Sequence, residues 1–259
     1  NKPFDAFLVC AGKDLIKLPH VVKAVIEHVV DLGKIHICTP RRIEPLPIDY
    51  PILYHTDKSI LNIDPFKWRF RPNWIYQQML KLFQDVTETN FYLTVDCDSI
   101  LVRDLRFFND HGQPVWYKGW DQNESPYYNF NSKMIGIQKV VDHTFLADMN
   151  FMNKTVVKYM LDINGMSVVD FINKSFNIVD MICHPSEADL YGQFAATYFP
   201  DMYEVREMKQ FNNGKHNDNP NAIIWDSEEI SDTINKNECG DYDVIQFHTW
   251  CLGVSDDWE

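Results

Sequence analysis

The opening of the chain alternates between the sequence patterns of strands and of a helix, and this alternation constrains the fold most. Residues 4–10 form a short apolar run, and residues 35–38 form another. Between them, apolar side chains recur at helical spacing over residues 18–29, and Gly33 marks the end of that helix. A strand, a helix and a second strand in this order favour a parallel sheet with a right-handed crossover. The sequence therefore predicts an α/β fold with a mostly parallel central sheet flanked by helices.

The later segments continue this alternation less regularly. A proline-rich stretch after residue 39 excludes an interior strand or helix there. We expect helices over residues 74–83, 153–163 and 186–198, and strands or extended segments over 52–55, 91–95, 116–117, 134–137, 145–152 and 244–248. No clear linker divides the chain, so a single continuous domain over residues 1–259 is predicted.

Composition and charge exclude some partners. The chain has 45% hydrophobic and 24% charged residues, as in an ordinary globular protein. Its 37 acidic and 24 basic residues give a net charge of −13. A surface of this sign repels nucleic acid and anionic lipid, so we expect no nucleic-acid partner. An anionic substrate would require local positive charge, from a metal ion or a few Lys and Arg residues.

Cysteine usage and the absence of targeting patterns bear on location. The six cysteines form no Cys-x-x-Cys pair, and Cys10, Cys38 and Cys97 fall within or beside apolar runs. They are typical of reduced core residues in a cytosolic protein. No apolar stretch reaches the roughly 20 residues of a membrane span, and no signal-peptide pattern is found. We therefore expect a cytoplasmic protein without a membrane span. The chain begins with Asn, which leaves open that it is one domain of a longer polypeptide.

The most informative motif is the Asp96-Cys97-Asp98 triplet that ends the apolar run 91–95. Carboxylates two residues apart after a strand point to the same side, at the edge where parallel sheets bind ligands. Carboxylate oxygens suit Mn²⁺ or Mg²⁺, and such an ion can neutralise the charge on a departing diphosphate. A second Asp-x-Asp, at positions 241–243, precedes its strand, where turn carboxylates are common. We therefore favour the first copy.

Two other classes of function remain open at this stage. An apolar strand followed by Asp-x-Asp also fits a haloacid dehalogenase-type phosphatase, with Asp96 as nucleophile. In that family the motif ends the first strand, whereas here a whole strand-helix-strand unit precedes it. A non-catalytic module that binds sugar or nucleotide is the third alternative.

A longer pattern surrounds the triplet. The stretch RPNWIYQQMLKL at 71–82, followed by FYLTVDCDS at 91–99, resembles the DUF6492 family of glycosyltransferases, whose pattern is a Trp, a Gln-Gln pair, Lys-Leu and a strand leading into Asp-x-Asp. The similarity continues through SEADLYG at 186–192 and reaches His248. The resemblance implies a GT-A fold, a Rossmann-like nucleotide-diphospho-sugar transferase domain, and Mn²⁺ or Mg²⁺ as cofactor. It implies transfer of a sugar from a UDP- or GDP-sugar to a hydroxyl acceptor, which we expect to be a glycan.

The resemblance also implies roles for single residues. Asp98 corresponds to the direct metal ligand, Asp96 to the residue near the ribose and the metal-bound water, and His248 to a late histidine that completes the metal shell. Lys13 and Asp14 follow the first strand, where proteins of this fold hold the nucleotide base. About 1–110 would be the nucleotide-sugar-binding half and about 111–259 the acceptor-binding half.

The helix before the triplet offers further candidates for donor binding. Trp74 with Gln78, and Gln77 with Lys81, are pairs four residues apart, so that each pair can face one cleft. Lys81 or Arg71 would supply positive charge for the diphosphate.

A base would complete an inverting mechanism, because the acceptor hydroxyl must lose its proton. Glu187 and Asp189 begin a predicted helix after Ser186, and we prefer them to Asp148 as the catalytic carboxylate. Capping of that helix by Ser186, with acidic residues in its first turn, explains the same pattern without catalysis. In a retaining enzyme these residues would bind the acceptor or the donor sugar instead.

Overall fold

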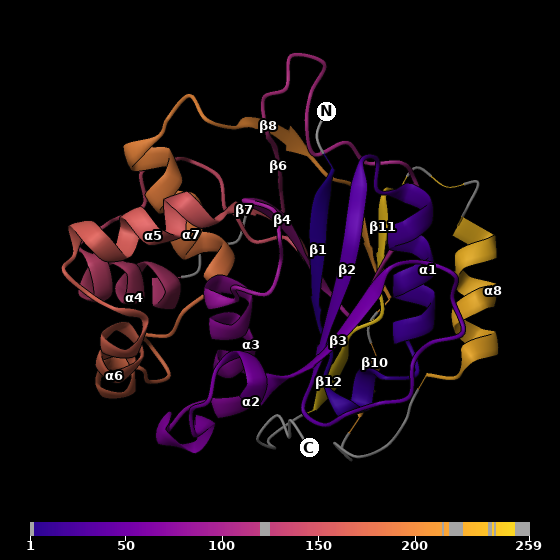
Figure 1. Ribbon diagram of the computed structural model, residues 1–259, viewed down its shortest axis with the longest axis horizontal. Coiled ribbons are helices and arrows are strands. Elements are labelled where there is room, and N and C mark those ends of the chain that lie inside the picture. The colour runs from indigo at the N-terminus through magenta and orange to yellow at the C-terminus, as the bar shows by residue number, and fades with distance from the viewer. Residues whose placement is uncertain are drawn as a thin grey trace.

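A five-stranded sheet forms the centre of the protein, in the order β3-β2-β1-β4-β7 (Figure 1). The computed structural model describes residues 3–119, 125–213, 215–217, 225–237, 240 and 242–251. The strands of the central sheet are β1 (Phe4–Val9), β2 (Leu32–Thr39), β3 (Ile52–Thr56), β4 (Phe91–Asp96) and β7 (Met149–Asn153). β1 to β4 run parallel, and β7 runs antiparallel to β4. The predicted α/β fold with a mostly parallel central sheet is confirmed.

Helices cover both faces of this sheet. The helices are α1 (Leu18–His28), α2 (Asp57–Ile60), α3 (Pro72–Phe83), α4 (Ser125–Ile135), α5 (Lys154–Ile163), α6 (Val168–Ile178), α7 (Glu187–Tyr198) and α8 (Ser227–Asn237), with short 3₁₀ turns η1 (Gly12–Asp14) and η2 (Pro65–Lys67). Figure 1 shows α3 to α7 on one side of the sheet and α1 and α8 on the other. Because β1 is covered on both sides, its side chains alternate between two cores: Phe7 and Val9 belong to one, Ala6 and Leu8 to the other.

The strand order changes direction between β1 and β4. The chain first builds β1, β2 and β3 in one direction across the sheet, and β4 then lies on the opposite side of β1. In parallel sheets, ligands bind at such a switch of direction, beyond the carboxyl ends of the strands. Val9 pairs with Asp96 at that end, so the loop after β1 and the Asp-x-Asp triplet meet at one edge.

Small sheets bring the last part of the chain to the same edge. β5 (Ser99–Leu101), β9 (Gln210–Asn212) and β11 (Val244–Gln246) form one, in which β11 pairs antiparallel with β5. Two further pairs join β6 (Val115–Lys118) to β8 (Glu204–Glu207), and β10 (Lys215–Asn217) to β12 (Thr249–Cys251). The β5–β11 pairing places the residues after β11 beside the triplet.

Some predicted segments are wrong. Residues 134–137 do not form a strand, because Met134 and Ile135 are the buried last residues of α4. Of the predicted extended segment 145–152, only the part from Met149 is strand. Helices α2, α4, α6 and α8 were not predicted. A cue for α6 was present, since Ser167 and Asp170 form a capping box at its start.

The cysteines agree with a narrower prediction. Cys10, Cys38 and Cys97 are buried and free, as expected of core thiols. Within the described ranges, no helix combines the length and the apolar character that crossing a membrane requires.

Candidate functional site

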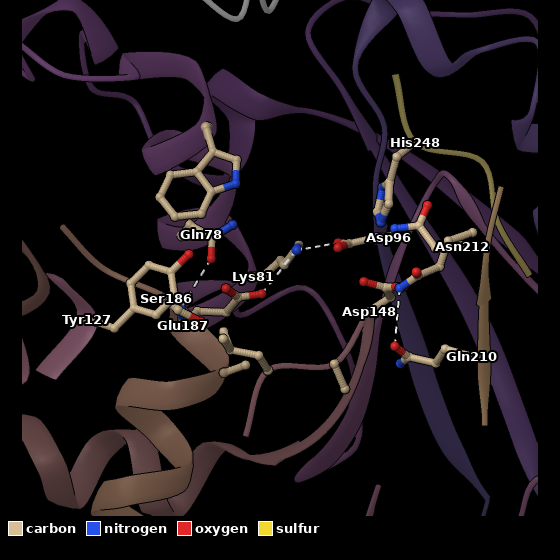
Figure 2. A pocket seen from close by; sticks show the side chains of 15 residues that line it. Gln78, Lys81, Asp96, Tyr127, Asp148, Ser186, Glu187, Gln210, Asn212 and His248 are labelled. Carbon is tan, nitrogen blue, oxygen red and sulfur yellow. Dashed lines mark hydrogen bonds and ion pairs between the residues drawn. The ribbon is translucent and has the colours of Figure 1, made fainter. Parts of the chain in front are cut away.

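A pocket of about 360 Å³ opens at the carboxyl edge of the central sheet. Its wall combines α3, α4 and the start of α7 with the ends of β4, β9 and β11. Figure 2 shows Asp96, Asp148 and His248 at one end of this pocket and Tyr127 at the other, with Lys81 and Glu187 between them. We call these the acidic end and the aromatic end.

At the acidic end, Asp98 and His248 contact each other. The His248 Nδ1 atom lies 2.8 Å from Asp98 Oδ2. The backbone supports the contact, because the Phe247 amide donates to the Asp98 carbonyl at 2.6 Å. The antiparallel pairing of Gln246 with Ser99 brings these distant segments together. The structure thus places Asp98 and His248 side by side, although only His248 is part of the pocket wall.

The charges of this pair depend on each other. Burial disfavours ionisation of Asp98, but His248, Lys17 and Lys13 outweigh it and hold the pKa of Asp98 below its usual range. Burial likewise lowers the pKa of His248, yet Asp98 outweighs that and raises it to about 9. In the absence of a metal ion, the pair is therefore a carboxylate beside an imidazolium at neutral pH.

Lys81 joins the first carboxylate of the triplet to α7. Its ammonium contacts Asp96 and lies 3.0 Å from Glu187 Oε1. Lys81 and Glu187 are both buried, whereas a third of the Asp96 side chain is exposed. Burial, with Asp148 and Asp98 nearby, raises the pKa of Asp96 to about 7, against the opposing effect of Lys81. The neighbouring carboxylates raise the pKa of Lys81 despite its burial, so this lysine stays charged.

Asp148 lines the pocket, although the acids of the later helix had been preferred to it as the catalytic carboxylate. Its carboxylate accepts hydrogen bonds from Ser99 Oγ at 2.8 Å and from Gln246 Nε2. Its carbonyl accepts from the Asp96 amide at 2.9 Å. Asp148 precedes β7, and the antiparallel direction of that strand puts its first residues at the ligand edge. Nothing in the local sequence indicated that direction.

The loop after β1 adds charged groups behind the triplet. Lys13 and Asp14 lie in η1, and Lys17 Nζ is 2.7 Å from Asp14 Oδ1. Burial and the nearby Asp98 raise the pKa of Asp14, while Lys17 and Lys13 oppose this. Lys17 is fully buried and acts electrostatically on Asp98, but the sequence analysis did not single it out. The sequence signal for Lys17 was its position three residues after Asp14, at the start of a helix.

At the aromatic end, Trp74 of α3 and Tyr127 of α4 line the pocket together with Gln78 and Glu187. Gln78 Oε1 accepts the Glu187 amide hydrogen at 3.2 Å, which ties the start of α7 to α3. The exposed Arg71 guanidinium lies 4.5 Å from the centre of the Trp74 ring. Tyr127 was not predicted, since nothing in the sequence relates α4 to the triplet.

Arg71, Gln77 and Asp189 were predicted as site residues but do not line the pocket. Asp189 is buried and accepts from Asn131 Nδ2 at 2.9 Å and Gln193 Nε2 at 3.2 Å. Gln77 lies one position along α3 from Gln78. In the second Asp-x-Asp, Asp243 accepts the Lys209 amide hydrogen at 2.9 Å, and Asp241 lies outside the described residues.

The side chains at the acidic end are of the types that bind a divalent cation, but they do not yet form a complete metal-binding site. Among the residues that the structure describes, no group of three or more His, Cys, Asp or Glu side chains is arranged to hold a metal ion. A magnesium-sized ion lies about 2.1 Å from each ligand atom. Two ligand atoms at right angles around such an ion are therefore about 3 Å apart. The 2.8 Å contact between Asp98 and His248 is close to that spacing. Asp96, in contrast, is engaged by Lys81.

Comparison with solved structures finds distant similarity to two glycosyltransferases. An active-site mutant of LgtC shares 14% identity, with 94% of this chain and 86% of that chain covered, at a TM-score of 0.48. The galactosyltransferase LgtC in complex with donor and acceptor sugar analogues gives 14% identity, 94% and 86% coverage, and a TM-score of 0.47. The glycosyltransferase GlyE of Streptococcus pneumoniae TIGR4 gives 13% identity over 80% of this chain, at a TM-score of 0.40, and the match spans 45% of GlyE.

Sequence comparison adds no closer similarity. No protein-family model matches the chain, and no curated protein matches its sequence. Membership of the DUF6492 family therefore stays a prediction.

Proposed function

We propose that this protein is a metal-dependent glycosyltransferase, which transfers a sugar from a nucleotide diphosphate sugar to a hydroxyl acceptor. The observation that carries the proposal is the convergence of Asp98 and His248, 2.8 Å apart, beside Asp96 at the switch of strand direction. Donor-sugar chemistry needs a cation at the diphosphate, and this edge is where a parallel sheet binds a nucleotide. On a protein of net charge −13, an anionic donor needs a local source of positive charge, which a cation bound here would supply.

A divalent cation, Mn²⁺ or Mg²⁺, would be held by Asp98 and His248, with Asp96 beside it. When bound, such an ion stabilises the negative charge on the departing nucleoside diphosphate. His248 would bind through its neutral imidazole, so it must first give up the proton that it shares with Asp98.

The donor is proposed to lie along the carboxyl ends of β1 and β4. Lys13 and Asp14 follow β1 and would contact the nucleotide, and the cations Lys13 and Lys17 are close enough to influence Asp98. Lys81 reaches the same pocket from α3. Its contacts with Asp96 and Glu187 support a role in fixing these two carboxylates.

Glu187 is the better candidate for the catalytic carboxylate. It lines the pocket and is held by Lys81, whereas the oxygens of Asp189 are bonded to buried amides. In an inverting reaction, the acceptor oxygen attacks the anomeric carbon as the bond to the diphosphate breaks. Glu187 would take the hydroxyl proton, and the nucleoside diphosphate would leave with the bonding electrons. Asp148 is the alternative base at the acidic end.

Hydrolysis of the donor tests this proposal without knowledge of the acceptor. The protein is incubated with a panel of UDP- and GDP-sugars, with and without MnCl₂, and released nucleoside diphosphate is measured. We expect release from at least one donor, dependent on the metal and lost in Asp98→Ala. Asp243→Ala, in the second Asp-x-Asp, is the matched control and should retain release.

Other results would favour the alternatives. Cleavage of a generic phosphate ester, without nucleotide release and dependent on Asp96, would replace the proposal by the phosphatase. Metal-dependent nucleotide binding that survives in Asp98→Ala would contradict the assignment of the metal site. Binding without turnover of any donor would indicate the non-catalytic module.

A further inference from the structure

The aromatic end of the pocket contains a paired ring surface. The ring centres of Trp74 and Tyr127 are 6.3 Å apart and their planes differ by 26°. Both side chains are half-buried and form part of the pocket wall. Rings at this distance and angle form a stacked pair, and both contribute apolar surface to the same pocket wall.

A buried histidine holds the two rings in place. The His184 ring stands edge-on to Trp74 at 5.7 Å and to Tyr127 at 5.3 Å. The His184 amide donates to the Pro126 carbonyl at 3.3 Å, next to Tyr127 in α4. The segment before α7 thus fixes α3 and α4 relative to each other. A surface fixed in advance loses less conformational entropy when a ligand binds.

Hydrogen-bonding groups border this surface on its inner side. Figure 2 shows Gln78 and Glu187 near Tyr127, on the side towards Asp96. The Glu187 carboxylate is fixed by Lys81 at 3.0 Å. An apolar face beside a carboxylate and an amide matches a saccharide ring, which presents C–H groups on its face and hydroxyl groups at its edge.

The distribution of charge separates this surface from the diphosphate. Glu187 at the aromatic end is already paired with Lys81, while Lys13 and Lys17 are the cations that influence Asp98 at the acidic end. Arg71 is a cation near Trp74, so nucleotide binding must be tested alongside saccharide binding. The contact of Trp74 with Tyr127 favours saccharide binding over the donor-binding role that its place before the triplet predicted.

We infer that Trp74 and Tyr127, positioned by His184, form the binding platform for a neutral saccharide ring, which is the acceptor of the reaction. The identification of this saccharide as the acceptor rests on the proposed glycosyltransferase function. Binding of the saccharide itself does not require turnover. The platform places a ring hydroxyl towards Glu187, between the aromatic surface and the metal-binding groups.

Saccharide binding in the absence of nucleotide tests the inference. A panel of methyl glycosides and disaccharides of glucose, galactose and N-acetylglucosamine is screened by saturation-transfer NMR, and the tightest binder is titrated. Tyr127→Ala and Trp74→Ala should each weaken its binding roughly tenfold, the effect of about 1.4 kcal/mol of lost stacking. Tyr127→Phe keeps the ring and should bind within about twofold of the wild type. Tyr159→Ala removes a partly exposed ring outside the pocket and should change nothing.

A second titration, with UDP and GDP in the presence of MnCl₂, separates this inference from the proposed function. We expect both alanine variants to bind nucleotide as the wild type does. Loss of nucleotide binding with saccharide binding intact would assign the rings to the donor and overturn the inference, as would a panel without any binder. Saccharide binding that depends on Tyr127, in a protein that releases no nucleotide from any donor, would uphold the platform and refute the proposed transfer. Thermal unfolding of each variant identifies losses that come from misfolding.

Discussion

At the scale of single residues, the surroundings of Asp96 shift its pKa in opposite directions. Burial disfavours its ionisation most, and the carboxylates of Asp148, Asp98 and Glu187 add to this effect, whereas Lys81 favours the ionised form. The balance raises its pKa to about 7 from an ordinary 3.8. A carboxyl group held in this way costs the folded state stability at neutral pH. Such a cost is common where residues are arranged for function.

This balance predicts a pH-dependent effect of Asp96→Asn. Between pH 4 and pH 7 the folded wild type binds more protons at Asp96 than the unfolded chain does, so its free energy of unfolding falls as pH rises. Asn does not titrate. We expect the variant to be more stable than the wild type at pH 7, with a difference that fades towards pH 4. Urea unfolding in the presence of a chelator measures this.

The exposed Asp110 provides the control for that series. Asp110→Asn lies outside the pocket and should leave the free energy of unfolding nearly unchanged at every pH. A stability difference for Asp96→Asn that is constant with pH, or largest at pH 4, would contradict the electrostatic account.

At the scale of elements, the position of α7 determines where Glu187 lies. Ser186 caps the helix by accepting the Asp189 amide hydrogen, and Gln78 accepts that of Glu187. Farther along, α7 packs tightly at Gly192, where a Cβ atom would lie 2.0 Å from Cγ of Phe145. The glycine therefore permits the close approach of the helix to the segment before β7.

Gly192→Ala tests this packing because two effects oppose each other in sign. Helix propensity alone predicts a gain of up to about 1 kcal/mol for alanine. The clash with Phe145 should outweigh it and destabilise the protein by about 1–3 kcal/mol, as measured by urea unfolding. The Phe145→Ala background removes Cγ and both Cδ atoms that the new Cβ would meet, so the same substitution should cost less there. A stabilised Gly192→Ala single variant would contradict the described packing.

The sequence predicted the elements of the first half well because their signals are local. The apolar runs of β1, β2 and β4 are buried on both faces, and the periodicity of α1 and α3 is unambiguous. The tight contact between Gly192 and Phe145 was not predictable, because neither residue has a local pattern that refers to the other. Similarly, the end of α4 at Ile135 could not be distinguished from a short strand by its apolar residues alone.

At the scale of the whole molecule, the pocket is built by both halves of the chain. β4 and α3 supply Asp96 and Lys81, while α7 and the end of the chain supply Glu187 and His248. Pattern and resemblance located most of these residues, since each follows or begins a regular element. Asp148 was ranked below the acids of α7 and Tyr127 was missed, because their places depend on the antiparallel direction of β7 and on the packing of α4 against α3. Both features belong to the tertiary structure and leave no local signal in the sequence.

The central claim is that Asp98 and His248 hold a divalent cation that binds the donor's diphosphate. Anomalous diffraction from crystals soaked with MnCl₂ and UDP or GDP measures this most directly. We predict a manganese peak in contact with Asp98 and His248, with the diphosphate on the same ion and the nucleoside near Lys13 and Asp14. A manganese peak at other carboxylates, or a nucleotide bound away from the edge of β1 and β4, would contradict it.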